Sequence, residues 1–404
     1  MHINILMYAD DIVILSESEQ GLQNCLNDLY QYCSNWKLQV NAHKSKIMVF
    51  NSNGRTFLNK FIYNNNVIET VPQYCYLGII LRYNGKFNLA INTLVEKARK
   101  AYFKLKKTIT INNTCKLFEK LFDCLISPIM LYCCEVWGSY CVFRDSDPFE
   151  NLHLKFIKEI LGVHSKTSND ACRAELSCIP LKSKIQFTMI NFLNHIYSSG
   201  NTIIYQIYKA TKNTNPWIQN TKELLNNLGY SYIFEREIIF ENELENIRQR
   251  IKDQNLQNQN SNIYQSSKLT FFNNIRVKGC RPYYVDNLIN ISERAAISKI
   301  RTSSHFLMIE KGRHSNIPRS ERFCPACNLE HIETEEHFLL HCPRYKQERL
   351  NLENKLNKII PKYKSLCSKY KLNILLNSKS TNVLRMSSSF IKTAFKARDK
   401  ITCC

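Results

Sequence analysis

One short segment, ERFCPACNLEHIETEEHFLLHCPRY (Glu321 to Tyr345), constrains the fold more than any other part of this 404-residue chain. It carries Cys324, Cys327, His337 and Cys342 at the spacing Cys-x2-Cys-x9-His-x4-Cys. Two thiolates on a turn, followed by a histidine and a third cysteine, form the ligand set of a tetrahedral zinc site. Four protein ligands close the coordination sphere, so we expect Zn²⁺ to have a structural role here. The alternative is four reduced side chains without a metal.

His341 is a second candidate for the fourth ligand. It follows His337 by four residues, which places both on one face of a predicted helix that begins with Thr334 as its N-cap. Because a thiolate binds zinc strongly, the sequence favours Cys342 and leaves His341 as a substitute.

The net charge of +21 indicates a polyanionic partner. Nucleic acid is favoured over a membrane, because the basic residues are interleaved with aromatic ones. Between Pro343 and Cys404, 15 Lys and Arg stand against three acidic residues, so +12 of the surplus lies in this basic tail. The segment EKARKAYFKLKK (Glu96 to Lys107) predicts an amphipathic helix with a row of lysines on one face. Each patch alone is typical of a solvated helix face, but together they favour phosphate contact.

The 17 cysteines do not indicate a disulfide framework, because the chain shows no secretory signal. The longest candidate for a membrane span, CLISPIMLYCC (Cys124 to Cys134), has 11 residues, contains Pro128 and is too short to cross a bilayer. We therefore expect mostly reduced thiols in a cytoplasmic or nuclear protein that is not secreted and has no membrane partner.

The segment LMYADDIVIL (Leu6 to Leu15) places Asp10 and Asp11 between two short apolar runs. These runs predict two strands joined by a tight turn, with the two acids at its tip. Burying adjacent carboxylates among apolar side chains is costly without a cation, and Mg²⁺ prefers oxygen ligands. The alternative is an ordinary Asp-Asp turn, which Asp favours for its own backbone reasons.

The pattern divides the chain into a small α+β unit and a long helical remainder. In the first unit, a helix is predicted over 19–36, a strand at the apolar end of 36–50, and a strand or hairpin over 73–81. The predicted units are 1–85, a helical region over 86–250, an Asn- and Gln-rich linker over 251–268, a C-terminal region over 269–345 that holds the zinc module at 321–345, and a basic helical tail over 346–404.

In this order, several segments resemble one family. YADD (Tyr8 to Asp11) in an apolar hairpin resembles the catalytic C motif of reverse transcriptases. WKLQVNAHKSKIMVF (Trp36 to Phe50) and QYCYLGIIL (Gln73 to Leu81) resemble the D and E segments of non-LTR retrotransposon enzymes of the LINE-type, jockey-like group. LISPIMLYCCEVWG (Leu125 to Gly138) resembles their thumb. RTSSHFLMIEKGR (Arg301 to Arg313), with the Cys/His segment after it, resembles their zinc-binding C-terminal region.

The resemblance implies an α+β fold: a truncated reverse-transcriptase palm, an all-α thumb or connector, and a small zinc-binding module. Asp10 and Asp11 would present Mg²⁺ to the primer end and the incoming nucleotide. Two metal ions clamp the attacking and leaving oxygens in this chemistry. The implied partners are an RNA template, a DNA primer or target DNA, and the RNA of the element.

Further roles follow from the same resemblance. Tyr8 would lie beside the template-primer duplex, and either Lys44 or Lys46 would lie near the triphosphate. The primer grip would be formed by Tyr76, Leu77 and Gly78. The alternatives are lysines on a surface loop and a strand aromatic that packs on a core.

In this family the A and B motifs precede YADD, and here only nine residues precede Asp10. Two carboxylates on one hairpin cannot hold two Mg²⁺ ions at a separation of about 3.5–4 Å. We therefore expect a fragment of an RNA-directed DNA polymerase that is inactive alone, with an open sheet edge and an exposed apolar face. The alternatives are a catalytically dead nucleic-acid-binding remnant and a non-functional product of a truncated element.

Overall fold

The N-terminal strands form small separate sheets, one of which packs against a helix. The computed structural model describes residues 4–51, 60–109, 114–144, 147–288, 290–327 and 329–402, so the first three residues and the last two of the predicted tail lie outside it. Strands β1 (Ile5–Tyr8) and β2 (Asp11–Ile14) form an antiparallel hairpin. A three-stranded sheet in the order β3-β5-β4 contains β3 (Lys46–Ile47), β4 (Phe61–Tyr63) and β5 (Asn66–Thr70). A second hairpin contains β6 (Gln73–Tyr76) and β7 (Ile79–Arg82).

Helix α1 (Glu19–Asn35) confirms the helix predicted over 19–36. It begins at an N-cap, Ser18, whose hydroxyl oxygen accepts a hydrogen bond from the Gly21 amide at 3.1 Å. Its apolar side chains pack on β4 and β5 and form a small core with Phe61 and Ile68. The strand predicted at the end of 36–50 is present but has only two residues, Lys46 and Ile47.

The remainder of the described chain is almost entirely helical, as predicted. The central helices, with the π-helical turn η1 and the 3₁₀ turn η2, are α2 (Asn88–Thr108), α3 (Cys115–Leu121), η1 (Phe122–Ile126), α4 (Ser127–Met130), α5 (Cys134–Trp137), η2 (Gly138–Tyr140), α6 (Pro148–Leu161), α7 (Asn169–Leu176), α8 (Leu181–Ser198), α9 (Ile203–Thr211), α10 (Pro216–Leu228), α11 (Ile233–Arg236) and α12 (Glu241–Gln265).

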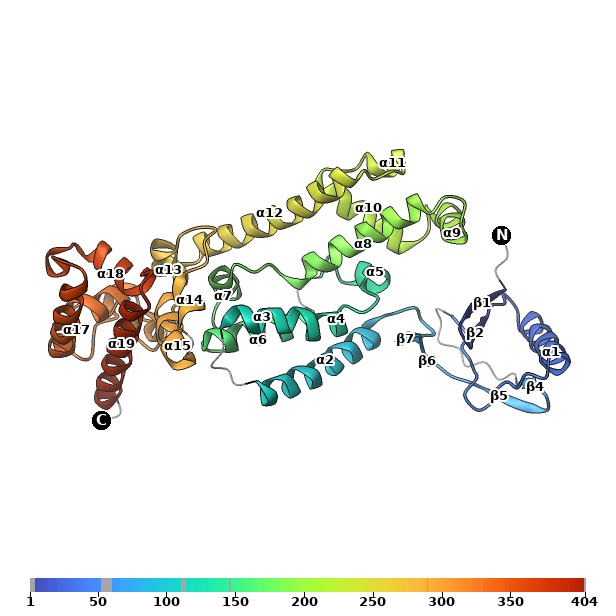
Figure 1. Cartoon of the computed structure of the whole chain (residues 1–404), viewed down its shortest axis with the longest axis horizontal. Coiled ribbons are helices and arrows are strands. Elements are labelled where there is room, and N and C mark those ends of the chain that lie inside the picture. The colour runs from blue at the N-terminus through green and yellow to red at the C-terminus, as the bar shows by residue number, and fades with distance from the viewer. Residues whose placement is uncertain are drawn as a thin grey trace.

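The C-terminal elements follow without a further strand in the described residues. They are η3 (Ser267–Leu269), α13 (Thr270–Ile275), α14 (Tyr283–Asn287), α15 (Ile291–Arg301), α16 (Met308–His314), η4 (Arg319–Glu321), η5 (His337–His341), η6 (Pro343–Tyr345), α17 (Lys346–Ile359), η7 (Tyr363–Ser365), α18 (Ser368–Asn377) and α19 (Thr381–Thr402). The molecule is elongated: the strands lie at one end, α2 to α12 fill the middle, and α13 to α19 lie at the other end (Figure 1).

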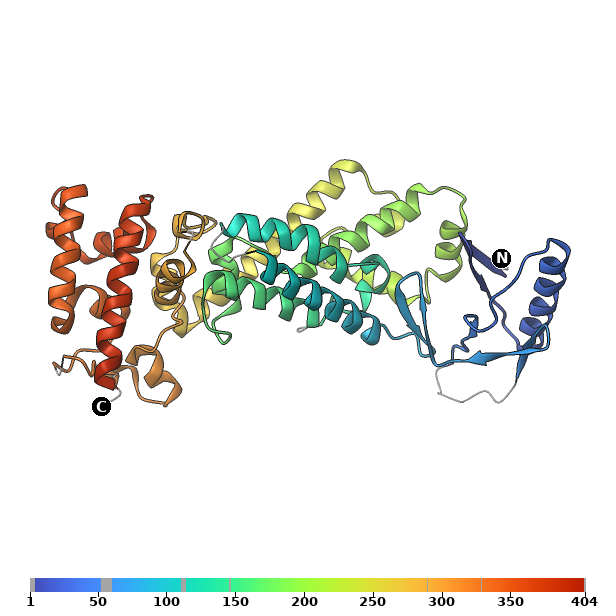
Figure 2. The ribbon, with the colours of Figure 1, turned by 60° about the horizontal axis from the view of Figure 1, so that its bottom comes forward.

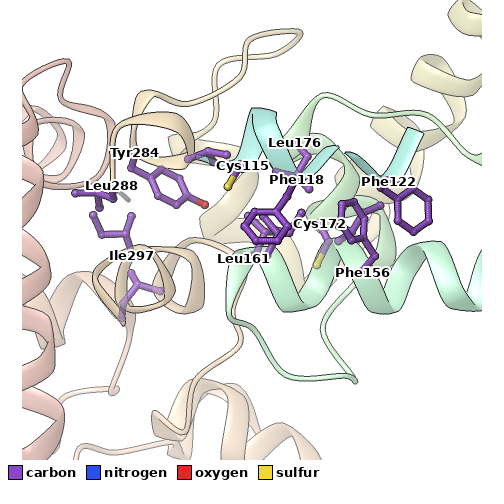
Figure 3. Packing of buried hydrophobic residues seen from close by; sticks show 14 of the residues in the cluster. Cys115, Phe118, Phe122, Phe156, Leu161, Cys172, Leu176, Tyr284, Leu288 and Ile297 are labelled. Carbon is purple, nitrogen blue, oxygen red and sulfur yellow. The ribbon is translucent and has the colours of Figure 1, made fainter. Parts of the chain in front are cut away.

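The main core lies where α2, α3 and α6 meet. Phe122 stacks on Phe156 with a ring-centroid distance of 4.2 Å, and Cys115, Phe118 and Leu161 are buried in the same cluster (Figure 3). Aromatic side chains of this size contribute most of the apolar area that a core removes from water.

The predicted amphipathic helix at 96–107 is confirmed as the C-terminal half of α2. Leu94, Ala98, Tyr102 and Leu105 face the core. The opposite face carries four exposed lysines, Lys97, Lys100, Lys104 and Lys107.

The linker predicted over 251–268 is wrong. Residues 251–265 belong to α12, a helix of 25 residues. Ile247 and Ile251 pack in one buried cluster and Ile263 in another, and Gln254 donates to the Asn227 carbonyl at 3.0 Å. Long-range packing on α7, α8 and α10 therefore orders a stretch whose composition is poor in apolar residues.

The described part of the basic segment, 346–402, is largely helical as predicted, but it does not project as a tail. Helix α19 packs on α15, α17 and α18 (Figure 2). Its Leu384, Phe390 and Ile391 are buried. Side chains of 269–345 and 346–404 share one apolar cluster, so the boundary predicted at 345 passes through a core. The amphipathic pattern of α19 explains the difference: one face is apolar enough to be buried.

Within the described residues, no single helix is long and apolar enough to cross a bilayer. Two consecutive segments, Cys115–Met130 and Cys134–Tyr140, are long and apolar enough only when taken together, and the chain bends by 64° between them. The cysteines that the structure describes are free thiols, and seven of them are buried: Cys33, Cys115, Cys134, Cys141, Cys172, Cys324 and Cys342.

Candidate catalytic and metal-binding sites

The YADD segment forms the predicted hairpin. Tyr8 and Asp11 face each other as the last pair of the β1–β2 ladder, and Ala9 and Asp10 form the two-residue turn. Ala9 has a φ of 52°, in the left-handed region that tight hairpin turns require. The two carboxylates therefore lie at the tip of a hairpin, as expected.

The hairpin is more exposed than its sequence indicates. Asp10 and Asp11 are accessible to solvent, so the burial cost expected for adjacent acids does not arise. The apolar neighbours are open as well: Met7 is 65% exposed and Tyr8 is 66% exposed. Among the described residues β1 and β2 pair only with each other, which confirms the expected open edge and apolar face.

The Gln73–Leu81 segment forms a hairpin with Leu77 and Gly78 at its turn. Both residues have positive φ, 45° and 83°, which is the requirement of a type I′ turn. Tyr132, which lies between α4 and α5, donates its hydroxyl to the Leu77 carbonyl at 2.9 Å. This contact attaches the hairpin to the helical region.

Tyr132 also lies near the YADD hairpin. The pKa of its hydroxyl is raised first by the Cys133 thiol and also by the Tyr8 hydroxyl. Tyr132 lies in the segment that resembles a thumb, and its sequence context predicts no role for it. The position of Tyr132 between two hairpins has no local sequence signal, because it depends on contacts 55 and more residues away.

The two lysines of the D-like segment have different surroundings. Lys46 forms an ion pair with Glu69 across the β3–β5 ladder, with Nζ and Oε2 at 2.7 Å. Lys44 is exposed on a turn, and its amide donates to the Asn41 side chain at 3.1 Å. Of the two, only Lys44 has its ammonium group outside an ion pair with a described carboxylate.

The Cys/His segment brings its four predicted ligands together. The ligand atoms of Cys324, Cys327, His337 and Cys342 all lie within 4.8 Å of one another. The sulfurs of Cys324 and Cys342 are 3.9 Å apart, and the Cys327 sulfur is 3.6 Å from His337 Nε2. Tetrahedral zinc at its usual bond lengths would separate two sulfurs by about 3.8 Å and a sulfur and a nitrogen by about 3.6 Å. The four residues therefore fit a zinc ion.

Local backbone contacts explain this convergence. The Cys324 amide donates to the His331 carbonyl at 2.8 Å, beside a β-bridge between Phe323 and Ile332. Thr334 caps the next helical turn as predicted, accepting from the His337 amide at 3.1 Å.

The alternative ligand His341 is not part of the cluster. The turn from His337 is π-helical, closed by a 2.7 Å hydrogen bond from the Cys342 amide to the His337 carbonyl. An i to i+5 bond places Cys342 over His337. The His341 side chain is 54% exposed and contacts Glu336 and Ser368. The structure thus supports Cys342 over its predicted substitute.

A buried ion pair supports the metal-binding cluster. Arg398 on α19 donates to Glu333, from Nε to Oε1 at 2.6 Å and from Nη2 to Oε2 at 2.8 Å. Glu333 Oε1 is 3.9 Å from the Cys324 sulfur, and Arg349 donates to the Cys342 carbonyl at 2.6 Å. Both arginines belong to the predicted basic tail, whereas in the structure they contact the backbone and the buried acid behind the four Cys and His side chains.

The electrostatics of the cluster favour one thiolate. The hydrogen bond to Cys342, followed by burial, raises the pKa of Cys324 to about 12. The same hydrogen bond lowers the pKa of Cys342. Metal binding requires deprotonated thiols, and of these two Cys342 loses its proton more readily.

Part of the chain is similar in sequence to known proteins. Residues 1–81 match the family model of reverse transcriptases, which are RNA-dependent DNA polymerases. The RNA-directed DNA polymerase from the mobile element jockey of Drosophila funebris is 27% identical over 218 residues, covering 52% of this chain and 23% of that protein. The polymerase of transposon BS from Drosophila melanogaster is 29% identical over 140 residues, covering 32% and 16%.

A transposon-derived protein of Caenorhabditis elegans is 26% identical over 136 residues, 33% of this chain and 48% of that protein. The matches to the polymerases thus span less than a quarter of those proteins' length. No solved structure matches the chain.

Proposed function

We propose that this chain, a relative of the reverse transcriptases of LINE-type, jockey-like mobile elements, is the C-terminal part of an RNA-directed DNA polymerase. The relationship that YADD indicates is confirmed by the match of residues 1–81 and by the jockey polymerases. The observation that carries the functional proposal is the position of Asp10 and Asp11 at the tip of a hairpin inside the matched region.

In this proposal Asp10 and Asp11 hold Mg²⁺. Exposed carboxylate oxygens suit this ion, which keeps several waters. When bound in such polymerases, Mg²⁺ ions stabilise the charge on the attacking and leaving oxygens of nucleotidyl transfer. The residues here fit this role incompletely, because the described part of the chain brings no third metal-binding side chain to the pair. We therefore propose that the chain does not extend a primer unless a further carboxylate is supplied.

The neighbouring residues have matching proposed roles. Tyr8, exposed at the end of β1, would contact the template-primer duplex, and Lys44 or Lys46 would lie near the triphosphate. Support for Lys44 comes from its ammonium group, which pairs with no carboxylate among the described residues, whereas Lys46 is engaged with Glu69. The primer grip would be the β6–β7 turn with Tyr76, Leu77 and Gly78.

We also propose that Cys324, Cys327, His337 and Cys342 hold a structural Zn²⁺. The donor set and its separations support this assignment. The ion would provide a fixed tetrahedral crosslink, and Arg398 with Glu333 would keep the ligands in place from the side of α19. Since the free thiols suit a reducing compartment, we propose a location in the cytoplasm or nucleus.

A second candidate function is nucleic-acid binding without polymerisation. The exposed lysine row of α2 supports it, because a row of cations along one helix face suits a phosphate backbone. The partners would be an RNA template, a DNA primer or target DNA, or the RNA of the element.

The test measures template-primer binding and primer extension with the full chain. We expect salt-sensitive binding that is unchanged in Asp10→Asn and weakened in Cys324→Ser, and no extension with Mg²⁺. A segment from a jockey polymerase that precedes the YADD hairpin is then added. Extension that appears with this segment and disappears in Asp10→Asn would support the polymerase proposal. Binding without any restored extension would favour the second candidate, and no binding at low salt would contradict both.

A further inference from the structure

A hollow of about 740 Å³ opens beside α6, away from the YADD hairpin and the metal-binding cluster. It is bounded by the C-terminal half of α6, the loop that follows and the start of α7. Lys155, Lys158 and Lys166 line it together with one acidic residue, Glu159. Lys155 and Lys158 are three residues apart on α6, so they lie on the same face of that helix.

The single acidic residue of the hollow is already engaged. Glu159 Oε2 accepts from the Tyr102 hydroxyl at 2.6 Å and from the Lys106 ammonium at 2.7 Å, both on α2. In the described residues, none of the three lysines that line the hollow has a carboxylate partner within 4.0 Å. The hollow therefore carries positive charge that no described carboxylate neutralises.

Lys158 is the most constrained of the three. It is half-buried, and its ammonium group donates to a neutral acceptor, the Ser165 carbonyl, at 2.6 Å. Burial lowers its pKa. A partly desolvated cation held by a carbonyl is stabilised when an anion enters beside it.

The charge of the hollow continues onto α2. The ammonium of Lys155 lies 4.9 Å from the centroid of the Phe103 ring, which is 43% exposed. Phe103 lies beside the exposed lysine row of α2, which includes Lys100, Lys104 and Lys107. The hollow is thus one end of a longer basic surface with an exposed aromatic ring in it, the arrangement that suits a strand with repeated phosphates and bases.

We propose that this hollow binds one phosphodiester group of a nucleic-acid strand, whose neighbouring phosphates lie along the lysine row of α2. The inference rests on the proposed nucleic-acid function and names where on the helical region the backbone is held. A polyanion explains the surface better than a small anion, because the unneutralised lysines extend well beyond one hollow.

The test compares two double variants of the full chain. Lys158→Gln with Lys166→Gln removes charge from the hollow, and Lys222→Gln with Lys252→Gln removes the same charge from exposed sites on α10 and α12. Binding of a single-stranded RNA of about 20 nucleotides is measured over a range of NaCl concentrations. The logarithm of the binding constant falls linearly with the logarithm of the salt concentration. Each lost phosphate contact makes this negative slope shallower by roughly 0.7. We expect this loss in the first variant only, and recovery in Lys158→Arg with Lys166→Arg.

A second measurement uses the wild-type chain, so it does not depend on whether a variant folds. Lysine acetylation is followed by mass spectrometry without ligand, with the RNA, and with inorganic phosphate at matched ionic strength. We expect the RNA to slow acetylation of Lys155, Lys158 and Lys166 more than that of Lys222 and Lys252.

The outcomes separate the two proposals. A chain that binds no RNA at low salt contradicts the proposed function and this inference together. A chain that binds RNA with equal slopes in both double variants, or without protection of the hollow, overturns the inference and leaves the proposed function standing. Protection by inorganic phosphate but not by RNA identifies a small-anion site and also overturns it.

Discussion

The guanidinium of Arg301 and the carboxylate of Glu175 form a bidentate ion pair in the core, although 126 residues separate them. Nη2 lies 2.7 Å from Oε1 and Nε lies 3.0 Å from Oε2, and both side chains are at most 2% exposed. The Tyr284 hydroxyl donates to the same carboxylate, and Asn377 accepts from Arg301. The pair therefore joins α7 and α15 to α14 and α18.

We expect Arg301→Met to lower the free energy of unfolding by about 3–5 kcal/mol, because it leaves Glu175 buried without a counterion. Urea denaturation followed by circular dichroism measures this change. Arg248→Met is the control, since the Arg248–Glu245 pair is exposed and worth less than about 1 kcal/mol. If Glu175→Met restores no stability to Arg301→Met, the uncompensated charge is not the cause.

The metal-binding cluster predicts one zinc ion per chain. Cys327→Ser should abolish stoichiometric zinc and lower the melting temperature, because three protein ligands no longer close the site. His341→Ala should keep both, since the His341 side chain points away from the other ligands. Inductively coupled plasma mass spectrometry of the purified chain, before and after treatment with a strong chelator, measures the zinc content. Equal losses in the two variants would contradict the assignment of Cys342 as the fourth ligand.

The turn of the β6–β7 hairpin predicts a large effect of Gly78→Ala. Gly78 has a φ of 83°, and an added Cβ would lie 3.2 Å from the Tyr132 ring. Strain of about 1–2 kcal/mol from the backbone alone is expected, with displacement of Tyr132 in addition. Gly85→Ala is matched, because Gly85 has a φ of 67° and open space around it. Hydrogen exchange of the amides over 73–82 should accelerate more in the first variant than in the second.

Buried thiols predict a loss of stability at alkaline pH. Burial raises the pKa of Cys115 and of Cys141 to about 12. A thiol whose pKa rises on folding contributes its full stability below the unfolded pKa, near 8.5–9, and loses it as the pH rises toward 12. Each thiol should therefore lower the free energy of unfolding by about 1.4 kcal/mol for each pH unit between about 9 and about 12.

Urea midpoints measured between pH 8 and 11 under reducing conditions test this expectation. The double variant Cys115→Ala with Cys141→Ala should show a shallower fall than the wild type, whatever its stability at pH 8. Parallel pH profiles for the two proteins would show that these thiols do not determine the alkaline limit.

The features that can be predicted from the sequence are those whose signals are local. The YADD hairpin, the strand or hairpin predicted over 73–81, and the amphipathic α2 each depend on residues that are close together in the chain. The metal-binding cluster belongs with them, because its four ligands lie within 19 consecutive residues, from Cys324 to Cys342. In each case the pattern of residue types determines the local backbone.

The features that sequence reasoning missed depend on distant contacts. Nothing near Arg301 indicates that it is buried against Glu175, and nothing near Tyr132 indicates the hairpin that it holds. Arg398 lies in a segment whose composition is typical of a solvated tail, yet its side chain is buried and pairs with Glu333. Polar residues take such positions only when a specific partner compensates them, and a single sequence does not reveal the partner.

Helix α12 has a consequence for how the length of this chain can vary. Its Asn- and Gln-rich sequence is typical of a tract that gains or loses residues freely. However, Ile251 is fixed in one core and Ile263 in another, on opposite sides of that tract. Inserting one residue between them would turn the far end by about 100° and shift it by about 1.5 Å, so the two cores would no longer be in phase. Inserting seven residues would nearly restore the phase but would still lengthen the helix by about 10.5 Å, so this low-complexity tract has a fixed length between the two cores.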